Sequence, residues 1–113
     1  MKNQFPLDAW NHCVLALVQA MLGAVSPNFR LIALSASGDV WRLQFVLEHE
    51  SESDREEIQD IATEFEALHE SPISYVIETS VNSGDLKWPA APTRVVFRRK
   101  ESALNNPESS TYS

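Results

Sequence analysis

The pattern of hydrophobic and polar residues predicts a helix over residues 7–24. Its apolar residues recur every three or four positions along one stripe, which further apolar residues widen: Trp10, Val14, Leu17 and Met21, then Leu15, Val18 and Leu22. A stripe this wide indicates a deeply buried helix. Asp8 is expected to be its N-cap, and Gly23 followed by Pro27 to close it.

Residues 29–36 and 40–49 predict strands, with a turn at 37–39. In the second segment, Trp41, Leu43, Phe45 and Leu47 point one way, and Arg42, Gln44, Val46 and Glu48 point the other. The two segments therefore predict a β-hairpin whose second strand has one polar side.

Residues 53–69 return to helical spacing. The stripe expected to face the core consists of Ile58, Ile61, Ala62, Phe65 and Leu68. Ser53 and Glu56 have the spacing of a capping box, in which each side chain satisfies a free backbone N–H at the start of the helix.

Two more strands are predicted over residues 73–81 and 93–100, separated by a loop over 82–92 that contains Gly84 and two prolines. In the first of them, Ile73, Tyr75, Ile77 and Val81 share one face, and Ser74, Val76, Glu78 and Ser80 share the other. Residues 102–113 are polar and aperiodic, so we expect them to form a disordered tail.

The order helix, strand, strand, helix, strand, strand predicts one α+β domain over residues 1–101. Two hairpins would form a four-stranded antiparallel sheet, with both helices on one face in a two-layer sandwich. The other face would be wet, because two of the strands carry a polar side. That wet face, with Arg42, Gln44, Val76 and Arg98, is a candidate second binding surface.

The net charge of −7 over 113 residues bears on partners rather than on the fold. A negative surface disfavours binding to nucleic acid and to anionic membranes, and it favours basic partners. The longest apolar run, residues 13–25, is too short to span a bilayer and lacks the flanking cations of a signal peptide, so a cytoplasmic location is expected. Cys13 is the only cysteine, which excludes an internal disulfide, and its apolar surroundings indicate a buried thiol.

The sequence contains no motif that indicates catalysis. His12, His49 and His69 lack the spacing of metal ligands, there is no glycine-rich phosphate loop, and no serine lies in a nucleophile elbow. Glu57 and Asp60 imitate a paired-carboxylate dyad, but a solvated helix face would raise the pKa of neither. We therefore expect a protein that is not an enzyme and that needs no metal or cofactor.

Negative charge gathers in residues 48–70, which hold ten of the sixteen acidic residues and a single arginine. Acids in the first turn of a helix stabilise its dipole, which accounts for Glu56 and Glu57. Asp60 and Glu64 lie beyond that turn, in like-charge i,i+4 pairs that each cost roughly 0.2–0.5 kcal/mol. We therefore predict a partner-binding surface at Glu56, Glu57, Asp60 and Glu64; the alternative is a face kept acidic for solubility.

Positive charge gathers in the last predicted strand, at Arg94, Arg98, Arg99 and Lys100. Cations protect an edge strand from pairing with another chain, and the negative net charge favours this interpretation over a nucleic-acid patch. Arg94 and Arg98 are expected to share a strand face. Trp88, in the loop, is expected to be a lid on the core, and a partner-binding residue if it is exposed.

Three segments resemble small bacterial immunity proteins found beside polymorphic toxins, of the contact-dependent growth-inhibition type. They are LGAVSPNFR (22–30), FVLEHESESDREEIQDIATEFEA (45–67) and RVVFRRKE (94–101), and they occur in the right order. The resemblance implies a binding protein without catalysis of its own, which neutralises one cognate toxin domain inside the cell that makes it. Many such toxins are nucleases with basic clefts, and an acidic helix suits such a cleft.

A second class of protein fits the same composition. Secretion-type chaperones are also small, acidic and α+β, but they dimerise and hold an unfolded segment of an effector. A small enzyme is disfavoured, because the sequence offers no convergent polar groups for a pocket. The activity of the toxin and the oligomeric state of this protein stay open.

Overall fold

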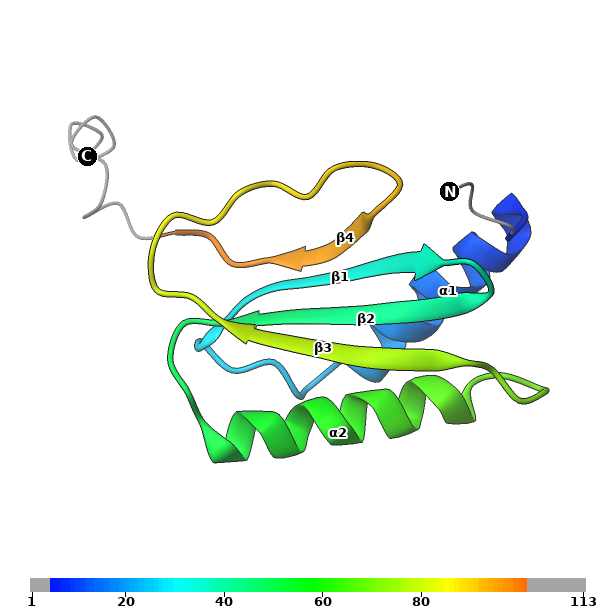
Figure 1. Cartoon of the computed structure of the whole chain (residues 1–113). Helices are drawn as coiled ribbons and strands as arrows, with labels where there is room; N and C mark the ends of the chain where they lie inside the picture. The colour runs from blue at the N-terminus through cyan, green and yellow to red at the C-terminus, as the bar shows by residue number, and fades with distance from the viewer. Residues whose placement is uncertain (1–4, 102–113) are drawn as a thin grey trace, which may run out of the picture.

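The computed structural model describes residues 5–101 and contains two helices and four strands (Figure 1). Along the chain these are α1 (Leu7–Ala20), β1 (Phe29–Ser37), β2 (Val40–Leu47), α2 (Glu52–Ala67), β3 (Tyr75–Val81) and β4 (Arg94–Arg98). The α+β class and the order of the elements are as predicted. The expected tail over 102–113 lies outside the described residues.

β1 and β2 form the predicted hairpin and pair antiparallel. Their turn contains Gly38, whose φ of +62° lies in the left-handed region that glycine adopts without steric cost. The register places Ile32 opposite Phe45 and Leu34 opposite Leu43. Hydrophobic side chains therefore meet across the hairpin on one face of the sheet.

The sheet is mixed, with the strand order β3-β2-β1-β4. β4 pairs antiparallel with β1, whereas β3 pairs parallel with β2, so the prediction of a purely antiparallel sheet with a second hairpin is wrong. The 16 residues of α2 carry the chain about 24 Å back along the sheet. β3 therefore begins beside the start of β2, where Tyr75 pairs with Trp41, and the two strands run in the same direction.

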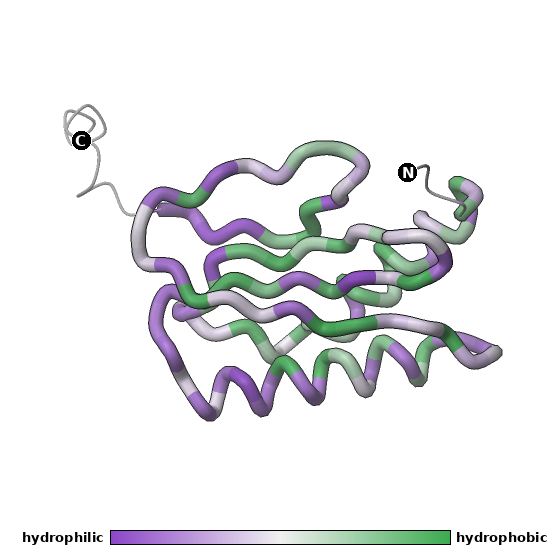
Figure 2. The backbone as a smooth tube through the Cα atoms, viewed as in Figure 1, coloured by the Kyte–Doolittle hydropathy of each residue, from purple (hydrophilic) through white to green (hydrophobic). Residues whose placement is uncertain are grey.

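One hydrophobic core joins both helices to alternate residues of the central strands. The largest fully buried side chains are Phe29, Phe45, Phe65, Leu17, Ile32, Leu34, Leu43, Leu47, Ile58 and Ile61. Trp10 of α1 meets the ring of Trp41 edge-on, with the centroids 5.0 Å apart. Figure 2 shows that hydrophobic and hydrophilic residues alternate along the turns of α2.

α1 buries a narrower stripe than predicted. Leu17 is fully buried, but Leu15 is 68% exposed. The reason is that the rest of the core covers α1 from one side only, so Leu15 faces outward. Leu22 is 72% exposed and lies outside the helix, because α1 ends at Ala20 and not at residue 24 as predicted. Within residues 5–101, no helix has the length and apolar character needed to cross a membrane.

The N-termini of both helices differ from the prediction. α2 begins at Glu52, and its N-cap is Ser51 rather than Ser53; the Ser51 hydroxyl accepts a hydrogen bond from the backbone N–H of Asp54 at 3.2 Å. α1 has no side-chain cap, because Pro6 occupies the cap position, and Asp8 lies inside the first turn. There Asp8 still favours the helix through its charge.

Candidate partner-binding surface

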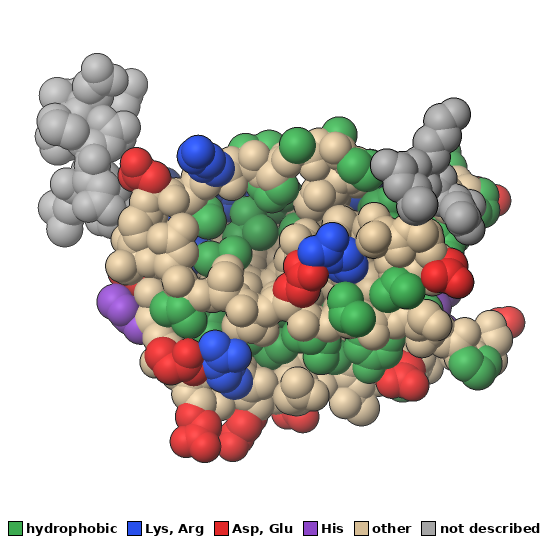
Figure 3. Space-filling model, in the orientation of Figure 1, with side chains coloured by type: hydrophobic (Ala, Val, Ile, Leu, Met, Phe, Trp, Pro, Cys, Tyr) green, Lys and Arg blue, Asp and Glu red, His purple; other side chains and the backbone are tan. Residues whose placement is uncertain are grey.

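The outward side of α2 is an uncovered acidic surface. The opposite side is anchored in the core by Ile58, Ile61 and Phe65. The four predicted acids are all exposed: Glu56, Glu57, Asp60 and Glu64, which we call the acidic face. Within residues 5–101, none of these four carboxylates has a hydrogen bond or an ion pair. Figure 3 shows acidic side chains projecting from the lower rim of the molecule, where α2 lies.

Other acids of the same segment stabilise the fold. The buried carboxylate of Asp54 accepts hydrogen bonds from Ser26 Oγ and Asn28 Nδ2, each at 2.9 Å. These bonds fasten the start of α2 to the segment between α1 and β1. Glu66, near the other end of α2, accepts a hydrogen bond from the Tyr75 hydroxyl at 2.9 Å. Sequence reasoning missed both roles, because the partners of Asp54 lie 26 and 28 positions away in the chain.

The arginine in the acidic segment does not neutralise the acidic face. Arg55 Nε lies 2.5 Å from a carboxylate oxygen of Glu50, just before the helix. The hydrogen bond from Arg55 lowers the pKa of Glu50, so this pair stays charged at neutral pH. The only arginine of the acidic segment is therefore directed to Glu50 and not to the acidic face.

β4 is an edge strand, as the cluster of cations predicted. Directly after it, Arg99 Nη1 lies 2.7 Å from Glu48 Oε1, and this hydrogen bond lowers the pKa of Glu48. Arg99 also donates a hydrogen bond to the backbone carbonyl of Pro27 at 2.8 Å. It thus joins the end of the sheet to the segments that enter β1 and leave β2.

A β-bulge places Arg94 and Arg98 on opposite faces of the sheet, so the prediction that they share a face is wrong. The guanidinium carbon of Arg94 lies 4.7 Å from the ring centroid of Trp10, on the side of the helices. That of Arg98 lies 5.1 Å from the ring centroid of Trp88, on the other side. One extra residue in a strand moves every later side chain to the opposite face.

Trp88 is a surface residue and not the predicted lid on the core, since 63% of it is exposed. It belongs to the loop between β3 and β4, whose residues Leu86 and Pro89 lie against the face of the sheet that the helices leave open. The structure therefore separates Trp88 from the acidic face, because α2 runs below the opposite edge of the sheet (Figure 1).

Arg30 is a structural residue that sequence reasoning missed. It is only 4% exposed, and its guanidinium donates hydrogen bonds to the backbone carbonyls of Asn82 at 2.5 Å and Gly84 at 2.8 Å. It also forms an ion pair with Glu101 at 2.8 Å, and this bond lowers the pKa of the Glu101 carboxyl. An arginine inside an apolar strand is the signal in the sequence that indicates such an anchor.

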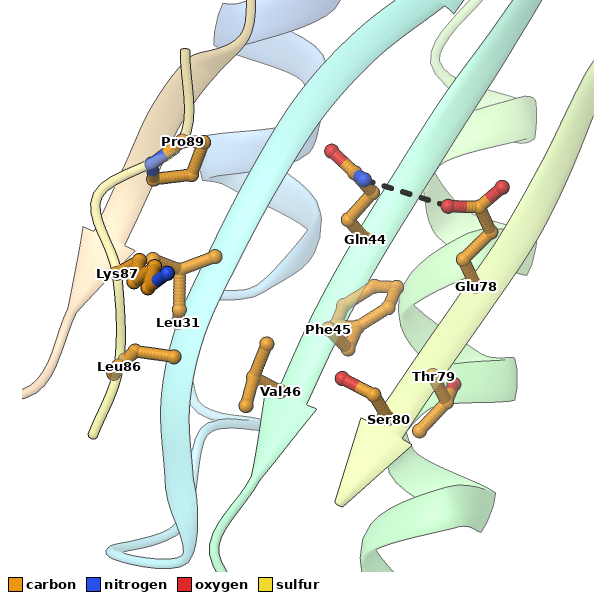
Figure 4. A pocket seen from close by; sticks show the side chains of 10 residues that line it. All are labelled: Leu31, Gln44, Phe45, Val46, Glu78, Thr79, Ser80, Leu86, Lys87 and Pro89. Carbon is orange, nitrogen blue, oxygen red and sulfur yellow. Dashed lines mark hydrogen bonds between the residues drawn. The ribbon is translucent and has the colours of Figure 1, made fainter. Parts of the chain in front are cut away.

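The open face of the sheet has a hollow of about 220 Å³ beneath the loop between β3 and β4 (Figure 4). Its lining consists of Leu31, Gln44, Phe45, Val46, Glu78, Thr79, Ser80, Leu86, Lys87 and Pro89. Glu78 is already occupied: Arg42 Nε donates to it at 2.9 Å and Gln44 Nε2 at 3.4 Å. The lining contains neither histidine nor cysteine, so it does not bring a nucleophile and a histidine base together.

The histidine and cysteine side chains that do meet lie between the helices. Cys13 Sγ is 3.5 Å from His69 Nε2, and the rings of His12 and His69 meet edge-on with centroids 4.8 Å apart. Burial raises the pKa of the Cys13 thiol to about 11, so the thiol is protonated and a poor nucleophile at neutral pH. Among the residues that the structure describes, no three His, Cys, Asp or Glu side chains are placed to hold a metal ion.

These observations define a small α+β domain in which the outward side of α2 is acidic and exposed. A family model described as MafI2 immunity protein matches residues 11–101, from the second turn of α1 through β4. The chain therefore belongs to the MafI2 immunity protein family, which confirms the resemblance to small bacterial toxin-immunity proteins. A comparison with curated proteins found no match.

Proposed function

We propose that this protein neutralises a cognate toxin domain by binding it directly, with the acidic face of α2 as the main contact. Membership of an immunity protein family supports the class of function. The observation that supports the surface is the set of four exposed carboxylates without a partner in the described chain. Like charges at i,i+4 spacing destabilise a helix. Binding to a cationic surface of another protein would explain why these acids are present despite that cost.

The toxin domain would present a basic surface, such as the cation-lined cleft of a nuclease. Long-range attraction between that surface and α2 would speed the encounter, and the bound immunity protein would exclude the substrate from the cleft. No catalysis by the immunity protein is needed for this inhibition. The complex would form in the cytoplasm of the cell that makes the toxin.

Trp88 is the second proposed contact. An exposed tryptophan in a loop offers a large apolar area, and tryptophan is enriched among residues that dominate binding energy. The guanidinium of Arg98 over the ring holds it in place at the surface. Because Trp88 is separated from the acidic face, its contribution can be measured independently.

Calorimetry tests the proposal, with the recombinant C-terminal domain of the protein encoded immediately upstream, roughly 100–300 residues, as the probe. We expect nanomolar binding, and a loss of about tenfold or more in the double variant Asp60→Lys/Glu64→Lys. The matched control is Asp39→Lys/Asp85→Lys, which changes two exposed acids outside α2. Both double variants move the net charge from −7 to −3, since each replaces two negative charges by two positive ones.

Each outcome is informative. Absence of binding contradicts the function. An equal loss in both double variants would attribute the effect to net charge and remove α2 as the contact. Tight binding that neither variant weakens would keep the function and move the site, and Trp88→Ala then tests the loop. A stable dimer that binds only an unfolded segment would identify a secretion-type chaperone instead.

A further inference from the structure

β3 ends the sheet with an outer edge to which no described segment is paired. The strand order places β3 last, beside β2, and its ladder with β2 runs from Tyr75 to Val81 without a register shift. Two side chains of this strand are large, apolar and exposed: Val76 at 44% and Val81 at 42%. An extended edge of this kind is a ready template for another strand.

The backbone groups of this edge can be assigned from the ladder. The N–H of Asn82 donates to the carbonyl of Leu47 at 2.8 Å, and the carbonyl of Ser74 accepts from Trp41 at 3.0 Å. Backbone groups alternate between the two sides of a strand. The residues at even positions of β3 therefore bond to β2, and those at odd positions direct their N–H and C=O groups outward: Tyr75, Ile77, Thr79 and Val81.

The opposite edge of the sheet is protected, which makes the bare edge of β3 informative. β4 has only five residues, carries a bulge, and holds Arg94 and Arg98. Short length, bulges and cations are devices that keep an edge strand from pairing. β3 has none of them: it contains no proline, lysine or arginine, and its register is regular.

Charge indicates what would pair there. Glu66 marks the flank of α2 nearest to β3, because it accepts a hydrogen bond from Tyr75. At about 100° per residue, Glu52 and Glu56 lie roughly 40° and 80° from Glu66 around the helix. All three carboxylates are exposed. A strand added to β3 would therefore run beside a row of acids, and α2 follows β3 along the sheet (Figure 1).

We propose that the toxin domain supplies an extended, basic segment that adds to the outer edge of β3 as a fifth strand. This inference rests on the proposed function and specifies its geometry. Up to four rungs of backbone hydrogen bonds would give affinity, and cationic side chains toward α2 would give specificity. To reach Asp60 and Glu64 as well, the body of the toxin would extend around the outward side of α2, because these acids lie roughly 120° and 160° from Glu66 around the helix. A second copy of this chain is disfavoured as the occupant, because it would bring a second acidic helix toward the first.

Residue-resolved amide hydrogen exchange tests the proposal, with the same recombinant toxin domain as the probe. In the free protein, the amides of Ile77, Thr79 and Val81 should exchange fast, and those of Glu78 and Ser80 slowly. In the complex, we expect the first three to slow at least about tenfold, because each gains a hydrogen bond. Tight binding without this alternating change would overturn the edge-strand docking and leave the proposed function standing.

A backbone substitution gives an independent test. Thr79→Pro removes an outward N–H without removing a bond to β2, and proline is tolerated at such edge positions. We expect it to weaken toxin binding by about tenfold, whereas the matched control Thr79→Val, which keeps the N–H and the shape, should bind normally. Equal binding by both variants would overturn the proposal. If Thr79→Pro fails to fold, the exchange pattern of the unaltered protein decides.

Two further outcomes separate the alternatives. Absence of any binding to the toxin domain would remove the proposed function and this inference together. If Ile77, Thr79 and Val81 exchange slowly in the free protein, and their protection increases with protein concentration, the edge pairs with a second copy. That result would overturn the toxin segment as the occupant and leave the acidic face to be tested by the charge variants.

Discussion

At the scale of single residues, charged side chains of the same type have opposite roles in this protein. Asp54 is buried and holds α2 to the segment before β1, whereas Asp60, two turns later, is exposed and unpaired within the described chain. Arg30 is buried among carbonyls and Glu101, whereas Arg94 and Arg98 lie over aromatic rings. The difference lies in the partners that the fold brings near, not in the residue type.

The ion pair between Arg30 and Glu101 yields a prediction about stability. Glu101→Gln should lower the free energy of unfolding by about 1–3 kcal/mol at pH 7, because a buried guanidinium loses its carboxylate. Arg30 lowers the pKa of Glu101, so the stabilisation is complete above the ordinary glutamate pKa of about 4.3 and is lost as the pH falls through the lowered value. Urea denaturation at neutral and acidic pH measures both effects.

The control for this prediction is Glu70→Gln, which removes an exposed carboxylate without a partner in the described chain. It should leave the free energy of unfolding unchanged at either pH. Wild type and Glu101→Gln should converge in acid, where both lack the charge at position 101. A difference that persists in acid, or equal stability at pH 7, would contradict the role assigned to the ion pair.

At the scale of secondary-structure elements, the sequence was sufficient to predict two helices, four strands and their order. It was sufficient because each element carries its own periodicity, which is a local property. Pairing between strands is not local, and the second hairpin was predicted from adjacency alone. The helix that separates β2 from β3 reverses the direction of the chain, and it is this reversal that produces a parallel pair.

Local signals also misplaced details of the elements. Ser51 and Ser53 both have side chains suited to an N-cap. The helix begins after Ser51, where Asp54 in its first turn is held by hydrogen bonds from Ser26 and Asn28. The wide apolar stripe of α1 indicated deep burial, but the amount of core that covers a helix is set by its neighbours. Tertiary contacts therefore fix what the periodicity leaves open.

Two leucines of α1 provide a matched test of this packing. Leu17→Ala should lower the free energy of unfolding by about 2–5 kcal/mol, because Leu17 is fully buried and its loss leaves a cavity. Leu15→Ala, two positions earlier and 68% exposed, should change it by less than about 0.5 kcal/mol. The two changes are chemically identical and lie in the same helix, so their difference reports burial. Equal effects in chemical denaturation would contradict the observed orientation of α1.

At the scale of the whole molecule, the acidic face could be predicted from the sequence, because helical spacing fixes which residues oppose the core stripe. Trp88 could not be placed, since its exposure depends on how a loop crosses the sheet. The bare edge of β3 could not be predicted either, because it exists only through the mixed strand order. A surface formed by one element can thus be predicted from a sequence, and a surface formed by the arrangement of several elements cannot.

The concentration of charge on α2 leads to a kinetic prediction for toxin binding. Exposed charges act over about 10 Å at 0.1 M salt and about 3 Å at 1 M, so attraction before contact is screened by salt. The association rate constant with the recombinant toxin domain should fall about tenfold or more between about 50 and 500 mM salt. The dissociation rate constant should change much less, because it reports contacts already formed. Stopped-flow fluorescence or surface plasmon resonance measures both.

The charge variants separate the field of α2 from net charge. Asp60→Lys/Glu64→Lys should flatten the salt dependence of association, whereas Asp39→Lys/Asp85→Lys, with the same net charge of −3, should retain most of it. An equal flattening in both would mean that total charge, rather than the helix, steers the encounter. An association rate independent of salt in the unaltered protein would mean that the acids of α2 do not meet a basic surface, and the proposed contact would have to be abandoned.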